Sequence, residues 1–548
     1  MSCYLKVPVA CFKNTLNGAF SNKEPWQIAT ITASTVLLSV WLYQFLFEDE
    51  EYITVRAKKT FFKYMKKIPS IKKKMQDELN SANKGFQNDM AKRFASSKHI
   101  TRLSKTNMET DEIYKLADIN LKLGTYSWSK GRVSGSVYFN DDNLRNLVKE
   151  MYAKASYTNP LHSDVFPGIC KMETEVVKMC ARLFHGDDDT CGTMTTGGTE
   201  SILMACKAYR DYASEVKGIK RPEMVLPVTA HAAFDKAAQY FKIRLRVIPV
   251  HTDTYQVDLK AFKRAINGNT IMLVGSAPNF PYGTMDDIGA ISDLGVKFNI
   301  PVHVDSCLGG FLTAFMEDAG YPAPHCDFRL PGVTSISADT HKYGYAPKGT
   351  SIVLYRSIVY LHHQYTTTTD WPGGVYGSPT INGSRAGGAI AACWATMLYF
   401  GVDRYIQATR EIIYTTRYIE KRLREIKDIF IFGQPATSVI AIGSHIFDVY
   451  RLQSALAAKG WNLNILQFPS GIHFCITTLH TTGTIADDFV TDVKSCVAEI
   501  MKDPGQPVQG KMAVYGAAQQ IPDRDIVGDV INYYLDAMYY IPPENVLE

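Results

Sequence analysis

Lys342 is the residue of this sequence whose chemistry can be predicted most directly. It follows His341 in the run 337–348, just after a short apolar stretch. A lysine amine in that position can form an imine with an aldehyde cofactor, and pyridoxal 5'-phosphate (PLP) is the cofactor that enzymes use in this way. A His-Lys pair alone is weak evidence for a PLP site, so the prediction depends on three motifs further upstream.

The first motif is the glycine-containing loop 195–201, which leads into a helical pattern. Glycines let the backbone approach an anion, and the free N–H groups of a helix start favour a phosphate. Gly197, Gly198 and Thr199 are therefore predicted to bind the phosphate of the cofactor. An ordinary helix start is the alternative, and the spacing fits neither a dinucleotide fingerprint nor a Walker loop.

The other two motifs are single polar residues close to predicted strands. His231 follows the strand-like run 224–228, where its ring could stack on a pyridine ring; a structural histidine is the alternative. Asp305 ends the run 302–305 and shares one strand face with His303, because side chains alternate along a strand. A buried carboxylate needs a cationic partner, which a protonated pyridine nitrogen, or else an Arg or Lys, would supply. Along the chain, the phosphate-binding glycine loop is followed by the histidine, the aspartate and the lysine, and this order predicts a PLP site.

Together these motifs carry a resemblance to a known family. The sequence resembles the sphingosine-1-phosphate lyases, PLP enzymes of the aspartate-aminotransferase fold type, from about Glu24 to about residue 540. The motifs that carry the resemblance are the runs 155–162, 195–201, 275–283, 303–310, 337–342 and 378–385. Glutamate-type decarboxylases share the Gly-Gly-Thr and Asp-x-His-Lys pieces. The runs 159–162 and 346–349, together with a membrane anchor, favour the lyases.

The resemblance implies a PLP-dependent carbon-carbon lyase. Such an enzyme would cleave the C2–C3 bond of a phosphorylated sphingoid base such as sphingosine 1-phosphate by retro-aldol chemistry, giving a long-chain aldehyde and phosphoethanolamine. Tyr138, His162 and Lys348 match family residues that face the phosphate of the substrate. A solvated loop charge is the alternative for Lys348.

Further site residues are expected on the same basis. Tyr282 and Tyr376 are candidates for proton transfer and substrate contact, although lone tyrosines more often pack in a core. His341 and Ser384 are expected to bind the PLP phosphate, with Ser384 reaching from the second subunit of a homodimer. The general base stays open among the freed Lys342, a tyrosine and the substrate phosphate.

Other functions fit the sequence less well. An amino-acid decarboxylase of the same fold would need a site for an α-carboxylate and no membrane anchor. A membrane-tethered scaffold without catalysis would lack the lysine or the aspartate, and both are present. An NAD enzyme would need the glycine fingerprint.

The composition is that of a globular protein. The 548 residues are 46% hydrophobic and 21% charged, which are globular values. The formal net charge of +5 gives no reason to expect a nucleic-acid partner. The 11 cysteines form no metal-like spacing and are typical of reduced thiols, so no metal site is predicted.

An uncharged segment near the amino terminus predicts a membrane anchor. The 23 residues 25–47 would form a helix of ~34 Å, enough to cross a bilayer core of ~30 Å. A signal peptide is the alternative, but no small-residue cleavage site follows. Six cations follow within residues 48–67 and three precede the segment, so the positive-inside rule predicts a cytosolic catalytic body. The resemblance implies the endoplasmic reticulum membrane.

Alternating strand and helix patterns predict an α/β fold, with a mostly parallel sheet covered by helices on both faces. The expected domains are a lumenal terminus (1–24), a transmembrane helix (25–47), a basic juxtamembrane connector (48–110), an arm (111–172), a large PLP-binding domain (173–400) and a smaller α/β domain (401–548). Strands are predicted at 224–228, 245–250, 271–275, 302–305, 335–338, 351–355, 430–432, 437–442 and 472–477. Helices are predicted at 173–184, 200–214, 287–298 and 386–400.

Overall fold

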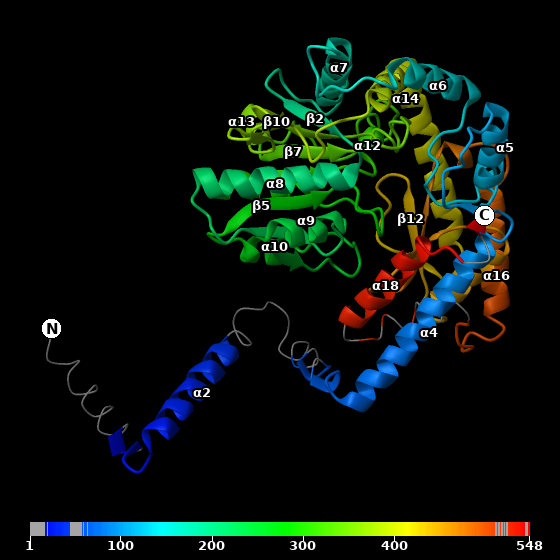
Figure 1. The fold of residues 1–548 in the computed structure, drawn as a ribbon. Helices are drawn as coiled ribbons and strands as arrows, with labels where there is room; N and C mark the ends of the chain where they lie inside the picture. Colours follow the sequence, from blue (N-terminus) through cyan, green and yellow to red (C-terminus); the bar gives the residue numbers. More distant parts are fainter. Residues whose placement is uncertain are drawn as a thin grey trace. The chain divides into compact units, whose positions relative to one another are not determined.

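The computed structural model describes most of the chain (Figure 1). The described residues are 17–18, 20–43, 57, 60–62, 64–509, 512, 516, 519, 521, 524–542 and 546–547. They fall into two units, one made of residues 1–123 with 520–548 and the other of residues 124–519. Residues 520–548 thus group with the amino-terminal segment, whereas the sequence pattern predicts them as part of the smaller carboxyl-terminal domain.

The first unit joins the two ends of the chain. Its elements are α2 (Pro25–Tyr43), α4 (Pro69–Arg93), β1 (His99–Ile100), α5 (Thr110–Leu121), α18 (Arg524–Met538) and β15 (Val546–Leu547). Helices α4 and α18 pack together, with the rings of Phe86 and Tyr534 edge to face at 5.6 Å. Strand β1 pairs with β15 in parallel. Segments more than 400 residues apart therefore stabilise each other.

Helix α2 lies within the predicted membrane anchor. Its 19 residues carry no charge, none of its side chains is buried, and its length of ~28 Å is close to the thickness of a bilayer core. Residues 44–47 of the predicted span lie outside the described residues, as do most of the flanking cations. By length and composition, α2 is a candidate membrane span.

A seven-stranded sheet forms the centre of the second unit. Its order is β2 (Cys191–Thr195), β8 (Ser351–Tyr355), β7 (Val333–Ala338), β6 (Val302–Asp305), β5 (Thr270–Ser276), β3 (Glu223–Pro227), β4 (Arg244–Ile248). Strand β8 runs antiparallel to both neighbours, and all other pairings in this sheet are parallel. The predicted, mostly parallel sheet is confirmed.

Helices cover both faces of this sheet. They and the remaining helices of the unit are η2 (Trp128–Lys130), α6 (Asp142–Ala155), α7 (Pro167–Leu183), α8 (Gly198–Val216), α9 (Ala233–Phe241), α10 (Leu259–Ala265), α11 (Ile288–Phe298), α12 (Gly310–Thr313), α13 (Ile358–His362), α14 (Gly387–Arg424), α15 (Val449–Ala458), η3 (Thr478–His480) and α16 (Ile485–Ile500). In β5, Leu273 belongs to the same buried cluster as Ile291 of α11, and the next residue, Val274, to the same cluster as Ile202 of α8. Because neighbouring side chains point to opposite faces of a strand, α8 and α11 lie on opposite sides of the sheet.

A second, four-stranded sheet is antiparallel throughout. Its order is β11 (Phe430–Ile431), β12 (Val439–Gly443), β14 (Gly471–Cys475), β13 (Asn464–Leu466), and a short hairpin of β9 (Thr366–Thr368) and β10 (Tyr376–Ser378) lies elsewhere in the unit. Helix α14 connects the large sheet to this one. Its helical geometry is interrupted at Gly401, which has a positive φ of 57°. The helix predicted at 386–400 is therefore the first part of α14.

Three buried histidines give the fold a defined pH dependence. Burial lowers the pKa of His303, His473 and His480 to about 4. The unfolded chain takes up protons near pH 6.5, so each histidine stabilises the native state above that pH and this stability is lost as the pH falls towards 4, by up to ~3 kcal/mol per residue. We expect urea unfolding free energies to decrease over this window. A His303→Gln variant should show a shallower decrease, and an unchanged slope would contradict the assignment.

Candidate active site

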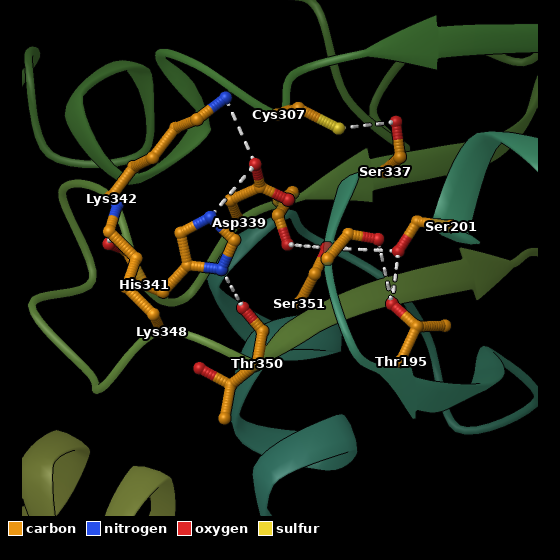
Figure 2. A network of polar contacts seen from close by, with 12 residues as sticks. Thr195, Ser201, Cys307, Ser337, Asp339, His341, Lys342, Lys348, Thr350 and Ser351 are labelled. Carbon is orange, nitrogen blue, oxygen red and sulfur yellow. Dashed lines mark hydrogen bonds and ion pairs between the residues drawn. The ribbon is translucent and has the colours of Figure 1, made fainter. Parts of the chain in front are cut away.

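Several of the predicted site residues gather at one edge of the large sheet. Asp305 ends β6, Lys342 follows β7, and Thr195 ends β2 opposite Ser351, where the antiparallel β8 begins. The carboxyl ends of parallel strands in an α/β sheet are where ligands bind. Figure 2 shows the polar network that these strand ends support.

Lys342 is held by a carboxylate that is also buried. Its Nζ lies 2.9 Å from Oδ2 of Asp339, and the Asp339 side chain is 3% exposed. Burial, the largest single influence, lowers the pKa of Lys342, but the charge and hydrogen bond of Asp339, together with smaller contributions from neighbouring groups, raise the pKa above its ordinary value. The amine therefore stays protonated while this pair is intact.

The side chain of Asp305 is held near Lys342 by contacts with two neighbouring residues. Its Oδ1 accepts the backbone N–H of Cys307 at 3.0 Å and the hydroxyl of Ser337 at 3.5 Å, and the Cys307 thiol donates to that hydroxyl at 3.2 Å. Among the described residues no Arg or Lys forms an ion pair with Asp305, and no hydrogen bond uses its Oδ2. The carboxylate can thus still accept a cationic ring nitrogen.

The predicted anion cradle lies beside Asp339. Strand β2 ends at Thr195, Gly197 has an extended backbone, and α8 begins at Gly198 without a side chain capping its first turn. Its first N–H groups are left for an anion. A Cβ at Gly198 would come within 2.7 Å of Oδ1 of Asp339 and 2.8 Å of the Cys307 sulfur, so only glycine fits there.

Two neighbouring glycines provide a matched test of this packing. Gly198→Ala should destabilise the fold by ~1–3 kcal/mol, because the added methyl group collides with Asp339 and Cys307. Gly197→Ala should be close to neutral, because a Cβ there meets nothing nearer than a His341 ring carbon at 3.8 Å. Denaturant unfolding of both variants measures the difference, and equal stabilities would contradict the close approach at Gly198.

His341 is a neutral histidine in this arrangement. Its Nδ1 faces the carbonyl oxygen of Thr350 and must donate to it, and burial lowers the pKa of the ring. Its Nε2 lies 3.6 Å from Oδ2 of Asp339, too far for a hydrogen bond. The ring lies next to Gly197, as the expected phosphate contact requires, but Nε2 would need a proton to donate to a phosphate.

His231 lies between β3 and α9, as the sequence predicts. Its Nδ1 accepts the backbone N–H of Ala233 at 3.1 Å, so the residue also helps to start α9. The ring is edge-on to Phe280 at 6.5 Å, and the side chain is exposed. A face of the ring is therefore accessible to a ligand.

The structure also brings together two of the expected substrate residues. Nζ of Lys348 lies over the ring of Tyr138 at 4.9 Å, and that ring meets Tyr343 edge to face at 4.9 Å. Burial, and then the charge of Lys342, lower the pKa of Lys348. Two lysines thus lie close to one another, and only Lys342 has a carboxylate within ion-pair distance among the described residues.

Four predicted residues lie outside this network. Tyr282 is 4% exposed; it packs with Tyr255 and Phe432, and its hydroxyl donates to a backbone carbonyl at 3.4 Å. These contacts are those of a core residue. His162 and Ser384 are exposed, and Tyr376 in β10 is half-buried against Trp371.

Sequence reasoning missed the role of Asp339. The residue belongs to the motif that contains Lys342, but the sequence alone gives no function for it. A carboxylate three residues before a lysine can form an ion pair if the intervening turn is helical, and this spacing was the available signal. Tyr343 was also missed: it is buried, and its hydroxyl donates to the Ile476 carbonyl at 2.6 Å, which joins the lysine loop to the residues that follow β14.

The residues present fit PLP. Lys342 provides an amine, the uncapped start of α8 suits a phosphate, Asp305 can pair with a ring nitrogen, and the exposed ring of His231 is free to stack. Gly197 and Gly198 keep the cradle open to a close ligand. No metal-binding cluster of His, Cys, Asp and Glu occurs among the residues that the structure describes.

Comparisons with known proteins agree with this chemistry. Residues 97–442 match the pyridoxal-dependent decarboxylase conserved domain. The chain is 59% identical to the sphingosine-1-phosphate lyase of Drosophila melanogaster over 529 residues, 96% of this chain and 97% of that protein. It superposes on the structure of the Burkholderia pseudomallei sphingosine-1-phosphate lyase with a TM-score of 0.74 and 38% identity, covering 82% of this chain and 99% of that one. A glutamate decarboxylase from Lactobacillus brevis, at 21% identity and a TM-score of 0.64 over 75% of this chain and 96% of that one, shows the fold alone.

Proposed function

The chain belongs to the sphingosine-1-phosphate lyase family of the PLP-dependent decarboxylase superfamily, and from this membership we propose that it cleaves phosphorylated sphingoid bases. The products are a long-chain aldehyde and phosphoethanolamine, released when the C2–C3 bond breaks. The observation that carries the proposal beyond family membership is Lys348. This second lysine lies beside Lys342 and has no carboxylate within ion-pair distance among the described residues.

In this proposal one set of residues binds the cofactor and another set binds the substrate. When bound, PLP supplies the aldehyde that amines attach to and withdraws electrons from the bond that breaks. Lys342 would hold the cofactor, the Asp305 carboxylate would favour the protonated form of the ring nitrogen, and the exposed ring of His231 would be available to stack on it. The start of α8, from Gly197 to Thr199, binds the cofactor phosphate together with His341.

The substrate phosphate needs cations near, but not at, the cofactor. Lys348 provides one, and Tyr138 fixes its ammonium group by a cation–π contact. His162 and Tyr376 complete the substrate site in this proposal. The proton of the substrate's 3-hydroxyl has to leave as the bond breaks; the candidate acceptors are the freed Lys342, a tyrosine of this site and the substrate phosphate, and Tyr282 is the least suited tyrosine because of its packing.

An assay with competing substrates tests this function. Purified full-length protein loaded with PLP should release aldehyde from sphingosine 1-phosphate and no carbon dioxide from glutamate or aromatic amino acids. Carbon dioxide release without aldehyde would assign the chain to the decarboxylases instead.

We propose further that the active unit is a homodimer with shared sites. His162 and Ser384 are exposed in the single chain and lie in segments with exposed apolar side chains, including Tyr157 and Val375 at 96% and 84% exposure. Exposed apolar residues next to expected site residues favour a partner chain that covers them.

Complementation between two inactive variants distinguishes shared from separate sites. Lys342→Ala and His162→Ala should each be inactive alone, and coexpression should restore activity, because one site of each mixed dimer then holds both intact residues. Sites built from a single chain would give no recovery.

We also propose that the protein is a single-pass protein of the endoplasmic reticulum membrane with its catalytic unit in the cytosol. Helix α2 is the candidate span, and the cations of residues 48–67 outnumber those before it by six to three. A membrane anchor would keep the enzyme at the bilayer that holds its lipid substrate.

A further inference from the structure

Asp339 is a buried carboxylate with one unused oxygen. Its Oδ2 forms the 2.9 Å ion pair with Lys342, while its Oδ1 is buried and has no hydrogen-bond partner (Figure 2). A buried charged oxygen without a partner is costly, so its retention at this position calls for a reason. The cofactor assignments above give Asp339 no role.

The other polar neighbours do not neutralise this carboxylate. His341 donates its Nδ1 hydrogen to Thr350 and keeps Nε2 3.6 Å away from Asp339. The start of α8 packs closely against the carboxylate, since Gly198 leaves no room for even a methyl group there. Asp339 is therefore fixed in place, and Lys342 is the cation that it meets.

We propose that Asp339 is a positioning residue for Lys342: its carboxylate holds the ε-amine in one place and keeps it charged, so that the amine loses its proton only when a ligand disturbs the pair. The site would then gate the reactivity of Lys342 rather than leave it permanently nucleophilic. Asp305 would keep its separate role at the ring nitrogen.

Asp339 is the anionic contact of Lys342, because the tyrosine, thiol and lysine groups around it are neutral or positively charged. Burial raises the pKa of the nearby tyrosine and thiols, which therefore stay neutral, and a nearby cation opposes protonation of Lys342. These groups are Tyr138, Cys307, Cys475 and Lys348. Removing the charge of Asp339 should consequently lower the proton affinity of Lys342 more than removing any of them.

The inference rests on the proposed role of Lys342, but its test needs neither substrate nor turnover. Full-length protein freed of cofactor is treated with formaldehyde and a mild borane reductant across pH 6–10, and the methylation of each lysine is followed by peptide mapping. In the wild type, methylation of Lys342 should still be rising at the highest pH. In Asp339→Asn its pH profile should move down, giving at least ~10-fold faster labelling at pH 8 for a change of one pKa unit or more.

Two comparisons separate this role from a structural one. Asp327→Asn removes another buried, ion-paired carboxylate, the partner of Arg329, and should leave the Lys342 profile unchanged. If Asp339→Asn does not fold, the wild type alone decides, because methylation of Lys348 should level off at lower pH than that of Lys342. Coincident wild-type profiles for the two lysines, or a folded Asp339→Asn protein with the wild-type profile, would overturn the proposal while leaving the lyase assignment intact.

Discussion

Lys342→Ala should lower turnover of sphingosine 1-phosphate by at least ~10³-fold, because the variant loses both the group that attaches the cofactor and a candidate for proton transfer. Borohydride reduction of the wild type should leave the cofactor mass on the peptide that contains residue 342. The same treatment of the variant should leave no lysine modified at stoichiometric level.

The matched control is Lys207→Ala. The Lys207 side chain is about as buried as that of Lys342 (17% and 20% exposed), but its ammonium group pairs with Asp211 and donates to backbone carbonyls away from the site. This variant should lose some stability and keep the adduct on Lys342. A wild-type adduct on any other lysine would refute the assignment of the cofactor.

Lys348→Met should raise KM for the phosphorylated substrate about 10- to 100-fold with PLP loading unchanged, because hydrogen bonds to a charged group contribute ~1.5–3 kcal/mol. Methionine keeps an unbranched side chain over the ring of Tyr138 but removes the charge. Steady-state kinetics together with cofactor absorbance measure the two effects separately.

A second lysine over an aromatic ring serves as the control for this variant. Nζ of Lys297 lies 5.8 Å from the ring centre of Phe298 on an exposed face of α11, so Lys297→Met should leave KM unchanged. If Lys348→Met loses cofactor and substrate affinity in equal measure, Lys348 binds the cofactor phosphate instead.

The large sheet could be predicted closely because burial leaves a clear pattern in the sequence. The strands at 302–305 and 351–355 have the predicted bounds, and each is buried along its whole length. Strand β2 was not predicted, since Cys191–Thr195 contains a glycine and two threonines, and its pairing with β8 is a long-range contact without a local signal.

The grouping of site residues could be predicted where the strands that carry them could be predicted. Asp305, Lys342 and the glycine loop meet because strand ends meet, which follows from the order of the elements alone. The separation of Tyr282 from this group depends on side-chain packing: the aromatic residues Tyr255 and Phe432, distant in sequence, enclose it. The ion pair of Asp339 with Lys342 could not be predicted for the same reason, because the sequence pattern does not show the direction of a carboxylate side chain.

The pairing of β1 with β15 and of α4 with α18 has a consequence during synthesis. Residue 100 leaves the ribosome long before residue 546, and at ~5–20 residues per second the delay is roughly 20–90 s. Over that time α4 leaves Leu79 and Met90, its buried apolar residues, without their cover. A nascent chain of this protein should therefore depend on chaperones for the segment translated first, and premature stop codons near the 3' end should be far more damaging than the small number of residues lost would suggest.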